Sequence, residues 1–174
     1  IDASASAGSF RVVLVRCTAR LLGVLGRGVD LLDEPPSDDD WYANLLWIDR
    51  RKCLLVTHGG TLFPVFVANV RKADLVPLGA LVAEHVAMAL SDERLPDDIL
   101  GMLDPGSARV TRTASRRILS FMNDSARACR YAVEDSGGLE HTDLDDLNRR
   151  LRRQLHDHDG YRQPLDSVLD RLVA

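Results

Sequence analysis

Three β-rich runs within residues 41–70 constrain the fold of this chain more than any other feature. The runs and the glycine pair that divides the last two are "WYANLLWID" (41–49), "KCLLVTH" (52–58), Gly59-Gly60 and "TLFPVFVANV" (61–70). Branched and aromatic residues favour strands, and a glycine pair can supply the positive φ of a tight hairpin. Three consecutive strands with short turns predict an antiparallel meander, in which residues 49–52 form the first turn. Pro64 lacks a backbone donor, so we expect it at a sheet edge or a bulge.

The first of these runs is apolar on both of its alternating faces. Successive side chains of a strand point to opposite sides. The two sets are Trp41, Ala43, Leu45 and Trp47 on one side, and Tyr42, Asn44, Leu46 and Ile48 on the other. Two apolar faces predict a strand that is covered on both sides.

The remaining pattern predicts an α+β fold. The expected elements are a strand at 10–15, a short helix capped by Thr18, a solvated loop at 26–40, a helix at 78–93, a short helix after Pro96, a strand within 107–113, a helix at 114–134, a helix opened by Thr142 with Asp145 and closed by Gly160, and a last helix after Pro164. We expect a small antiparallel sheet, built from residues 10–15 and 41–70 and covered by helices of the C-terminal half. Residues 10–174 then form a single domain, and residues 1–9 form a flexible tail or an added remnant.

Composition bounds the class of protein. The chain has 174 residues, of which 45% are hydrophobic and 28% charged, as expected for a globular domain. Its net charge of -4 argues against a protein whose main task is to grip nucleic acid phosphates. No apolar run is long enough to cross a membrane and no signal peptide is seen, which predicts a cytoplasmic protein. The cysteines, Cys17, Cys53 and Cys129, fit reduced thiols inside a cell.

The first candidate site is a polar row on the helix predicted at 114–134. At about 100° per residue, one line along this helix contains Arg116, Ser120, Asn123, Arg127 and Arg130. Guanidinium groups bind carboxylate and phosphate with two parallel hydrogen bonds, so the row suits an anionic ligand or an acidic partner. The alternative is a solvated helix face closed by Glu134, four residues after Arg130, and this reading is favoured.

Other candidate sites have simpler structural explanations. "LHDHDGY" (155–161) could ligate a metal, but His156 and His158 are two residues apart and point to different sides of a helix, so we expect no metal. Cys17 with His58 or His85 could form a nucleophile and base, yet a buried core cysteine is the expected outcome. Motifs of the common hydrolases, zinc proteases and nucleotide binders are absent, and no cofactor is predicted.

The residues around the first predicted turn form a third candidate. Asn44 could orient a ligand and Arg51 could bind an anion, whereas the structural alternative is that Asn44 and Asp49 satisfy nearby backbone groups. Trp41 and Tyr42 follow the acidic loop and are candidates for an aromatic entrance to a groove or an interface.

Five sequence blocks occur together in one order. They are "RCT" (16–18), "WYANLLWIDRRK" (41–52), "LLVTHGGTLFPVFV" (54–67), "TASRRILSFMND" (113–124) and "GYRQP" (160–164). Together they resemble an uncharacterised bacterial family, one of the numbered domains of unknown function, over nearly the whole chain. The resemblance implies a bacterial origin and marks as motif positions Arg16, Asn44, Asp49, Arg51, Arg116, Asn123 and Asp124. The family usually has Thr-Ala-Asn-Arg-Ser where this chain has Thr113, Ala114, Ser115, Arg116 and Arg117, and it brings no activity with it.

The leading functional hypothesis is a non-catalytic interaction module. It would bind a protein or a small anionic ligand through Trp41, Tyr42 and the arginine row, without a nucleic acid or a membrane as partner, and in an oligomeric state left open. The alternative is an enzyme or nucleotide-handling protein with a pocket formed by Arg16, Asn44, Asp49, Arg116 and Asp124. A regulator of toxin–antitoxin or nucleic-acid type is a further alternative, which the acidic net charge disfavours.

Overall fold

The fold is known from a computed structural model, which describes residues 13–26, 30–106, 108–158 and 160–174. The proposed tail at 1–9 and the first half of the strand expected at 10–15 lie outside these residues. The described strands are β1 (Leu14–Cys17), β2 (Trp41–Ile48), β3 (Arg51–His58), β4 (Pro64–Val67) and β5 (Arg109–Arg112). The described α-helices are α1 (Ala19–Leu25), α2 (Leu78–Asp92), α3 (Arg116–Asp135), α4 (Leu144–Arg153) and α5 (Pro164–Leu169). Short 3₁₀ turns are η1 (Lys72–Leu75), η2 (Leu139–His141) and η3 (Asp170–Leu172).

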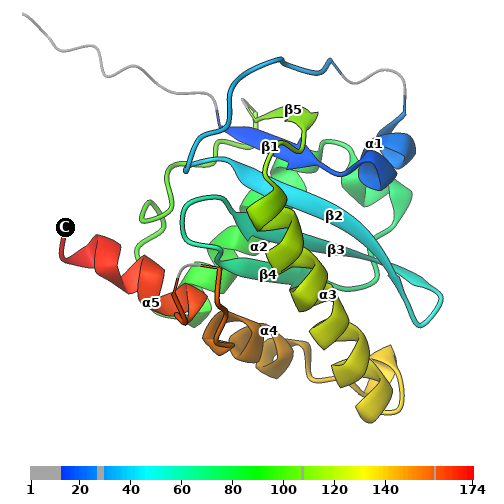
Figure 1. The fold of residues 1–174 in the computed structure, drawn as a ribbon. Coiled ribbons are helices and arrows are strands. Elements are labelled where there is room, and N and C mark those ends of the chain that lie inside the picture. Colours follow the sequence, from blue (N-terminus) through cyan, green and yellow to red (C-terminus); the bar gives the residue numbers. More distant parts are fainter. Residues whose placement is uncertain (1–12, 27–29, 107, 159) are drawn as a thin grey trace, which may run out of the picture.

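The strands form one mixed sheet in the order β4-β3-β2-β1-β5 (Figure 1). The meander is confirmed, since β2 pairs antiparallel with β3, and β3 with β4. The expectation of a purely antiparallel sheet is wrong, because β1 runs parallel to both of its neighbours, β2 and β5. Parallel neighbours need a crossover connection, and α1 lies in the connection from β1 to β2. The sequence showed this helix, but not which edge of the meander the first strand would join.

The two turns of the meander differ from the expected ones. Asp49 and Arg50 alone form the first turn, both with positive φ (50° and 61°), as a two-residue hairpin requires. Gly59 and Gly60 do not have positive φ, so their expected role is wrong. They are needed for space instead: an added Cβ would lie 3.0 Å from the Asp40 carbonyl oxygen at Gly59, and 2.9 Å from that of Asp38 at Gly60.

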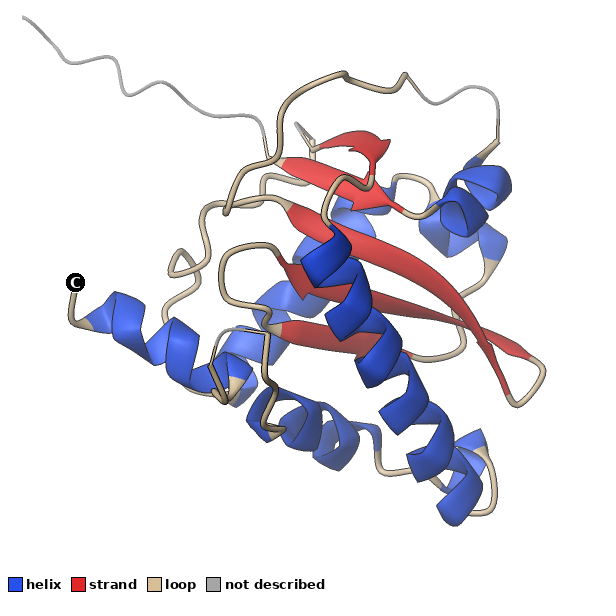
Figure 2. Ribbon diagram, in the orientation of Figure 1, coloured by secondary structure: helices blue, strands red, loops and turns tan. Residues whose placement is uncertain are grey.

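Helices cover both faces of the sheet (Figure 2). One face packs against α1, α2 and α5, through residues such as Leu21, Val82 and Val168. The other packs against α3 and α4, through residues such as Met122 and Leu147. The strand β2 contributes alternate side chains to both cores, so its prediction as a doubly covered strand is confirmed.

Helix positions follow the sequence pattern closely, and their caps less so. The helices expected at 78–93 and 114–134 are α2 and α3, displaced by no more than two residues at either end. The segment after Pro96 forms turns, not a helix. The helix α4 is capped by Asp143, whose side chain accepts from the Asp146 backbone N–H, and it ends at Arg153 well before Gly160.

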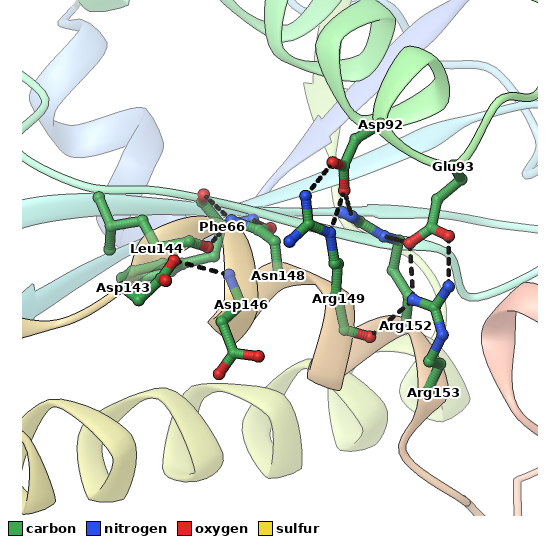
Figure 3. A network of polar contacts seen from close by, with 10 residues as sticks. All are labelled: Phe66, Asp92, Glu93, Asp143, Leu144, Asp146, Asn148, Arg149, Arg152 and Arg153. Carbon is green, nitrogen blue, oxygen red and sulfur yellow. Dashed lines mark hydrogen bonds and ion pairs between the residues drawn. The ribbon is translucent and has the colours of Figure 1, made fainter.

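The outer edge of β4 is closed by α4 (Figure 3). The Asn148 side chain accepts from the Phe66 N–H at 2.8 Å and donates to the Phe66 carbonyl at 3.0 Å, as a neighbouring strand would. Pro64 begins this edge strand, as expected, and offers no N–H. An open strand edge invites pairing with other chains, so the amide of Asn148 and the proline together protect the sheet.

Arginines at the end of α4 bind the end of α2 (Figure 3). Arg152, only 1% exposed, donates to Asp92 and Glu93 at 2.7 Å each, and its guanidinium lies over the Phe63 ring. Arg149 pairs with Asp92, and Arg153 with Glu93. Since α2 and α4 pack on opposite faces of the sheet, this network holds α4 across the edge.

Replacing Asn148 should destabilise the domain through the exposed edge. Asn148→Ala leaves the Phe66 N–H and carbonyl without partners, at a cost of about 1–3 kcal/mol in the free energy of unfolding measured with urea. Asn123→Ala, at an exposed position of α3, is the control and should change it by less than about 0.5 kcal/mol. Equal stability of the two variants would contradict the edge-closing role.

The carboxylates of this network predict that the folded domain loses stability in acid. Hydrogen bonds from Arg149 lower the pKa of Asp92 below its ordinary 3.8. Burial raises the pKa of Glu93, but hydrogen bonds from Arg153 and Arg152 outweigh it and lower the pKa below 4.5. A lowered pKa in the folded state stabilises the fold above the ordinary pKa, and this contribution is lost as the pH falls through the folded value.

We therefore expect the free energy of unfolding to fall as the pH drops below these ordinary values. Urea titrations across this range should show a shallower fall for the double variant Asp92→Asn, Glu93→Gln. An unchanged slope in that variant would show that other carboxyl groups carry the acid sensitivity.

Candidate functional site

The prediction of an aromatic entrance at Trp41 and Tyr42 is wrong. Trp41 and Tyr42 are each 1% exposed and belong to the cores on opposite faces of the sheet. The Trp41 ring packs edge-on against His58, at 4.9 Å between centroids. Because the first run is apolar on both sides, strand alternation sends one ring into each core. Neither ring can contact a partner.

Arg16 is a structural residue. Its Nε donates to Asp40 at 2.7 Å with both side chains 2% exposed, and its Nη1 and Nη2 groups donate to the carbonyls of Glu34, Pro35 and Arg112. A buried charge is tolerated only where its donors are satisfied, and here the partners are the loop before β2 and the end of β5. Arg16 therefore fastens the 34–40 segment to the sheet.

Removing the carboxylate of this pair should be costly. Asp40→Ala leaves the buried Arg16 charge without its partner, and we expect a loss of about 3–5 kcal/mol in the free energy of unfolding. Asp146→Ala breaks an exposed pair with Arg150 and should cost no more than about 1 kcal/mol. Urea unfolding of both variants measures the contrast, and a loss at Asp40 as small as that at Asp146 would refute the role given to Arg16.

The other residues of the hairpin also serve local structure. The Asn44 carboxamide oxygen accepts from the Thr18 hydroxyl at 2.9 Å, which joins β2 to the start of α1. The Asp49 carboxylate accepts from the Leu139 N–H at 2.9 Å and so fastens η2 to the hairpin. Arg51 donates to Asn69 and Glu140 at the same end of the sheet.

The five residues of the alternative polar pocket do not converge. Arg16 is buried under the 34–40 segment, and Arg116 is exposed at the first turn of α3. Asp49 binds Leu139, beyond the last turn of the same helix, which rises about 28 Å over its 20 residues. A single pocket of Arg16, Asn44, Asp49, Arg116 and Asp124 is therefore wrong.

Cys17 and His58 are chemically unsuited to nucleophilic catalysis. Burial raises the pKa of the Cys17 thiol to about 12, and the thiol donates to the Val15 carbonyl within the core. Burial, with the nearby charge of Arg171, lowers the pKa of His58 to about 3, so this ring is neutral. His85 lies on α2, with its Nδ1 3.0 Å from the Leu81 carbonyl oxygen. A thiol that stays protonated is a poor nucleophile.

The described histidines of the 155–161 segment are not brought together with a third possible metal ligand. The rings of His156 and His158 lie 5.9 Å apart, and His158 faces Asp124 at 3.4 Å. Within the described ranges, no three histidine, cysteine, aspartate or glutamate side chains are placed to hold a metal ion.

The arginine row on α3 is exposed to solvent. Its members Arg116, Ser120, Asn123, Arg127 and Arg130 all face solvent, while the opposite stripe of α3 is buried. Arg127 makes an ion pair with Asp124 at 3.6 Å. In the part of the chain that the structure describes, Arg116 and Arg130 have no ion pair. The expected pair between Arg130 and Glu134 is therefore not formed. The row thus offers three guanidinium groups to a partner.

A hollow lies beside this row. It has a volume of about 540 Å³ and lies between α3 on one side and residues 154–158 with Tyr161 on the other; its lining includes Arg127, Tyr131, Leu155 and His158. A larger hollow of about 830 Å³ follows the β4 edge, where Asn148 and Arg152 are already engaged with the protein itself. Sequence reasoning missed both hollows and the α2–α4 network, because no pattern along the chain pairs residues 92–93 with residues 149–153.

The fold and this surface define a mixed α+β domain with a basic, exposed face on one long helix. None of the described helices has the length and apolar character to span a membrane. The chain belongs to the family described as Domain of unknown function (DUF6933), whose family model matches residues 14–167. This confirms the predicted resemblance to a numbered domain of unknown function, while the bacterial origin stays a prediction. No curated protein and no solved structure matches the chain.

Proposed function

We propose that this domain is a non-catalytic interaction module that binds an acidic segment of a partner protein along the exposed face of α3. The observation that carries the proposal is the arginine row: three guanidinium groups on one helix face, two of them without an ion pair among the described residues. Other arginines, such as Arg16 and Arg152, are engaged in fastening the fold.

The length of the row favours an extended partner over a small anion. From Arg116 to Arg130 the helix rises about 21 Å, which about six or seven residues of an extended chain span. A small anion would reach only one or two of these arginines. Acidic side chains spaced along a segment can meet all three, and exposed pairs of this kind contribute about 0.2–1 kcal/mol each.

The charge of the whole domain adds selectivity. With a net charge of -4, the molecule repels acidic surfaces in general, whereas the α3 face attracts them locally. A partner that carries an acidic segment is therefore attracted to the α3 face in preference to the rest of the surface.

A synthetic peptide tests the proposal. The probe is a fluorescein-labelled peptide of about ten residues with alternating glutamate and alanine, whose binding to the full chain is followed by fluorescence anisotropy at low salt. The triple variant Arg116→Glu, Arg127→Glu, Arg130→Glu should bind it at least about tenfold more weakly, because three attractive pairs become repulsive. Binding to the natural chain should also weaken as salt increases.

A second triple variant is the matched control. Arg20→Glu, Arg94→Glu, Arg109→Glu changes the net charge equally at exposed arginines outside α3 and should retain most of the binding. Equal losses in both variants would show a general charge effect and contradict the proposal. Competition by inorganic phosphate at peptide-like concentrations, or tighter binding of a labelled DNA duplex, would point to a small anion or a nucleic acid in place of a protein segment.

A further inference from the structure

The hollow beside the arginine row is apolar at its floor, and its rim carries the rings of Tyr131 and Tyr161 together with the carboxylates of Asp124 and Asp157. Phe121, which is buried, lies at the floor, and the rings of His156 and His158 meet it edge-on at 5.2 and 6.0 Å between centroids. Tyr131 and Tyr161 line the hollow with 61% and 77% of their surface exposed, and Leu155 with 62%. Its volume of about 540 Å³ lies within the range of pockets that hold small ligands or single side chains.

The side chains at the rim pack little, but backbone hydrogen bonds join the two ends of the loop. The backbones of His156 and Arg162 exchange two hydrogen bonds of 3.1 Å, which close the loop that carries Tyr161. Tyr161 itself has a φ of 55°, in the left-handed region that a bulky residue seldom adopts. A strained backbone that holds an aromatic ring in solvent contributes nothing evident to the core, and such strain is typical of binding sites.

The hollow and the arginine row are adjacent surfaces of one helix. Arg127 belongs to both, and around the helix Tyr131 lies about 40° from it, on the side away from Arg130. A chain lying along the row therefore passes the mouth of the hollow at Arg127. Its carboxylates face the arginines while a neighbouring side chain can enter the hollow.

We propose that the hollow binds one large apolar side chain, best an aromatic one, of the acidic segment that the α3 face engages. This inference rests on the proposed function and states which acidic segments the α3 face would select. The occupant follows from the two surfaces together: guanidinium groups select carboxylates, and exposed tyrosines around an apolar floor select an apolar anchor. The partner motif is thus an apolar residue flanked by acidic residues, not an acidic run alone.

Two matched peptides and the full chain test this specificity. The first is the alternating glutamate and alanine peptide, and the second has one central alanine replaced by phenylalanine. Anisotropy titrations should give about tenfold tighter binding of the phenylalanine peptide, as expected for burying one aromatic ring. The double variant Tyr131→Ala, Tyr161→Ala should lose this preference and still bind the alanine peptide normally.

Two further variants guard against indirect effects. Ala128→Leu fills the hollow from α3 and should also abolish the preference, and Trp47→Ala removes an exposed aromatic ring on β2 and should retain it. Urea unfolding checks that each variant is folded.

The outcomes separate this inference from the proposed function. If both peptides bind the natural chain equally, the anchor site is refuted and the arginine face stands. If neither binds, the proposed function fails and the anchor site with it. A phenylalanine preference that survives in both the tyrosine double variant and Ala128→Leu would place the anchor elsewhere and overturn the inference.

Discussion

The need to bury both faces of β2 governs the architecture. A strand with apolar side chains on both sides requires a layer on each, and here α1, α2 and α5 form one layer and α3 and α4 the other. Each core takes one of the aromatic residues Trp41 and Tyr42, which we had expected at a groove or an interface because they follow the acidic loop. This requirement explains the long amphipathic helices. Each of them has an outward face that takes no part in the core.

A sheet that is covered on both faces still has edge strands that need protection. The polar network of α4 protects one of them, β4. Asn148 replaces a neighbouring strand at Phe66, and the arginines of α4 reach across to the acidic end of α2. The buried pair of Arg16 and Asp40 has a similar role away from the β4 edge, because it fixes the segment that leads into β2. Many of the charged motif residues are thus used for assembly, which explains why they do not gather into one pocket.

The features that were predicted correctly are those that depend on residues close together in the sequence. Periodicity located α2 and α3, and the β-rich runs located the meander, because hydrophobic spacing is written along the chain itself. The parallel placement of β1 and the α2–α4 ion pairs join residues far apart in sequence, and nothing in a single sequence orders such pairings. The site shows the same division. The alignment of Arg116 with Arg130 was predicted from helix geometry and lies on one exposed face, whereas the hollow beside Arg127 depends on the positions of residues 154–158 and Tyr161, which the sequence does not reveal.

The two adjacent surfaces of α3 would contribute to binding in different ways. Exposed arginines act over distances up to about the Debye length of 8–10 Å, so they raise the rate of encounter with an acidic segment and weaken with salt. An apolar anchor acts only after contact, and it lengthens the lifetime of the complex by removing ring surface from water. Arg127 belongs to both surfaces, and its ion pair with Asp124 at 3.6 Å is exposed and loosely held. A carboxylate of the partner can therefore displace Asp124 from Arg127 at little cost. That exchange would couple the binding of the acidic segment along the arginine row to the entry of its apolar side chain into the hollow.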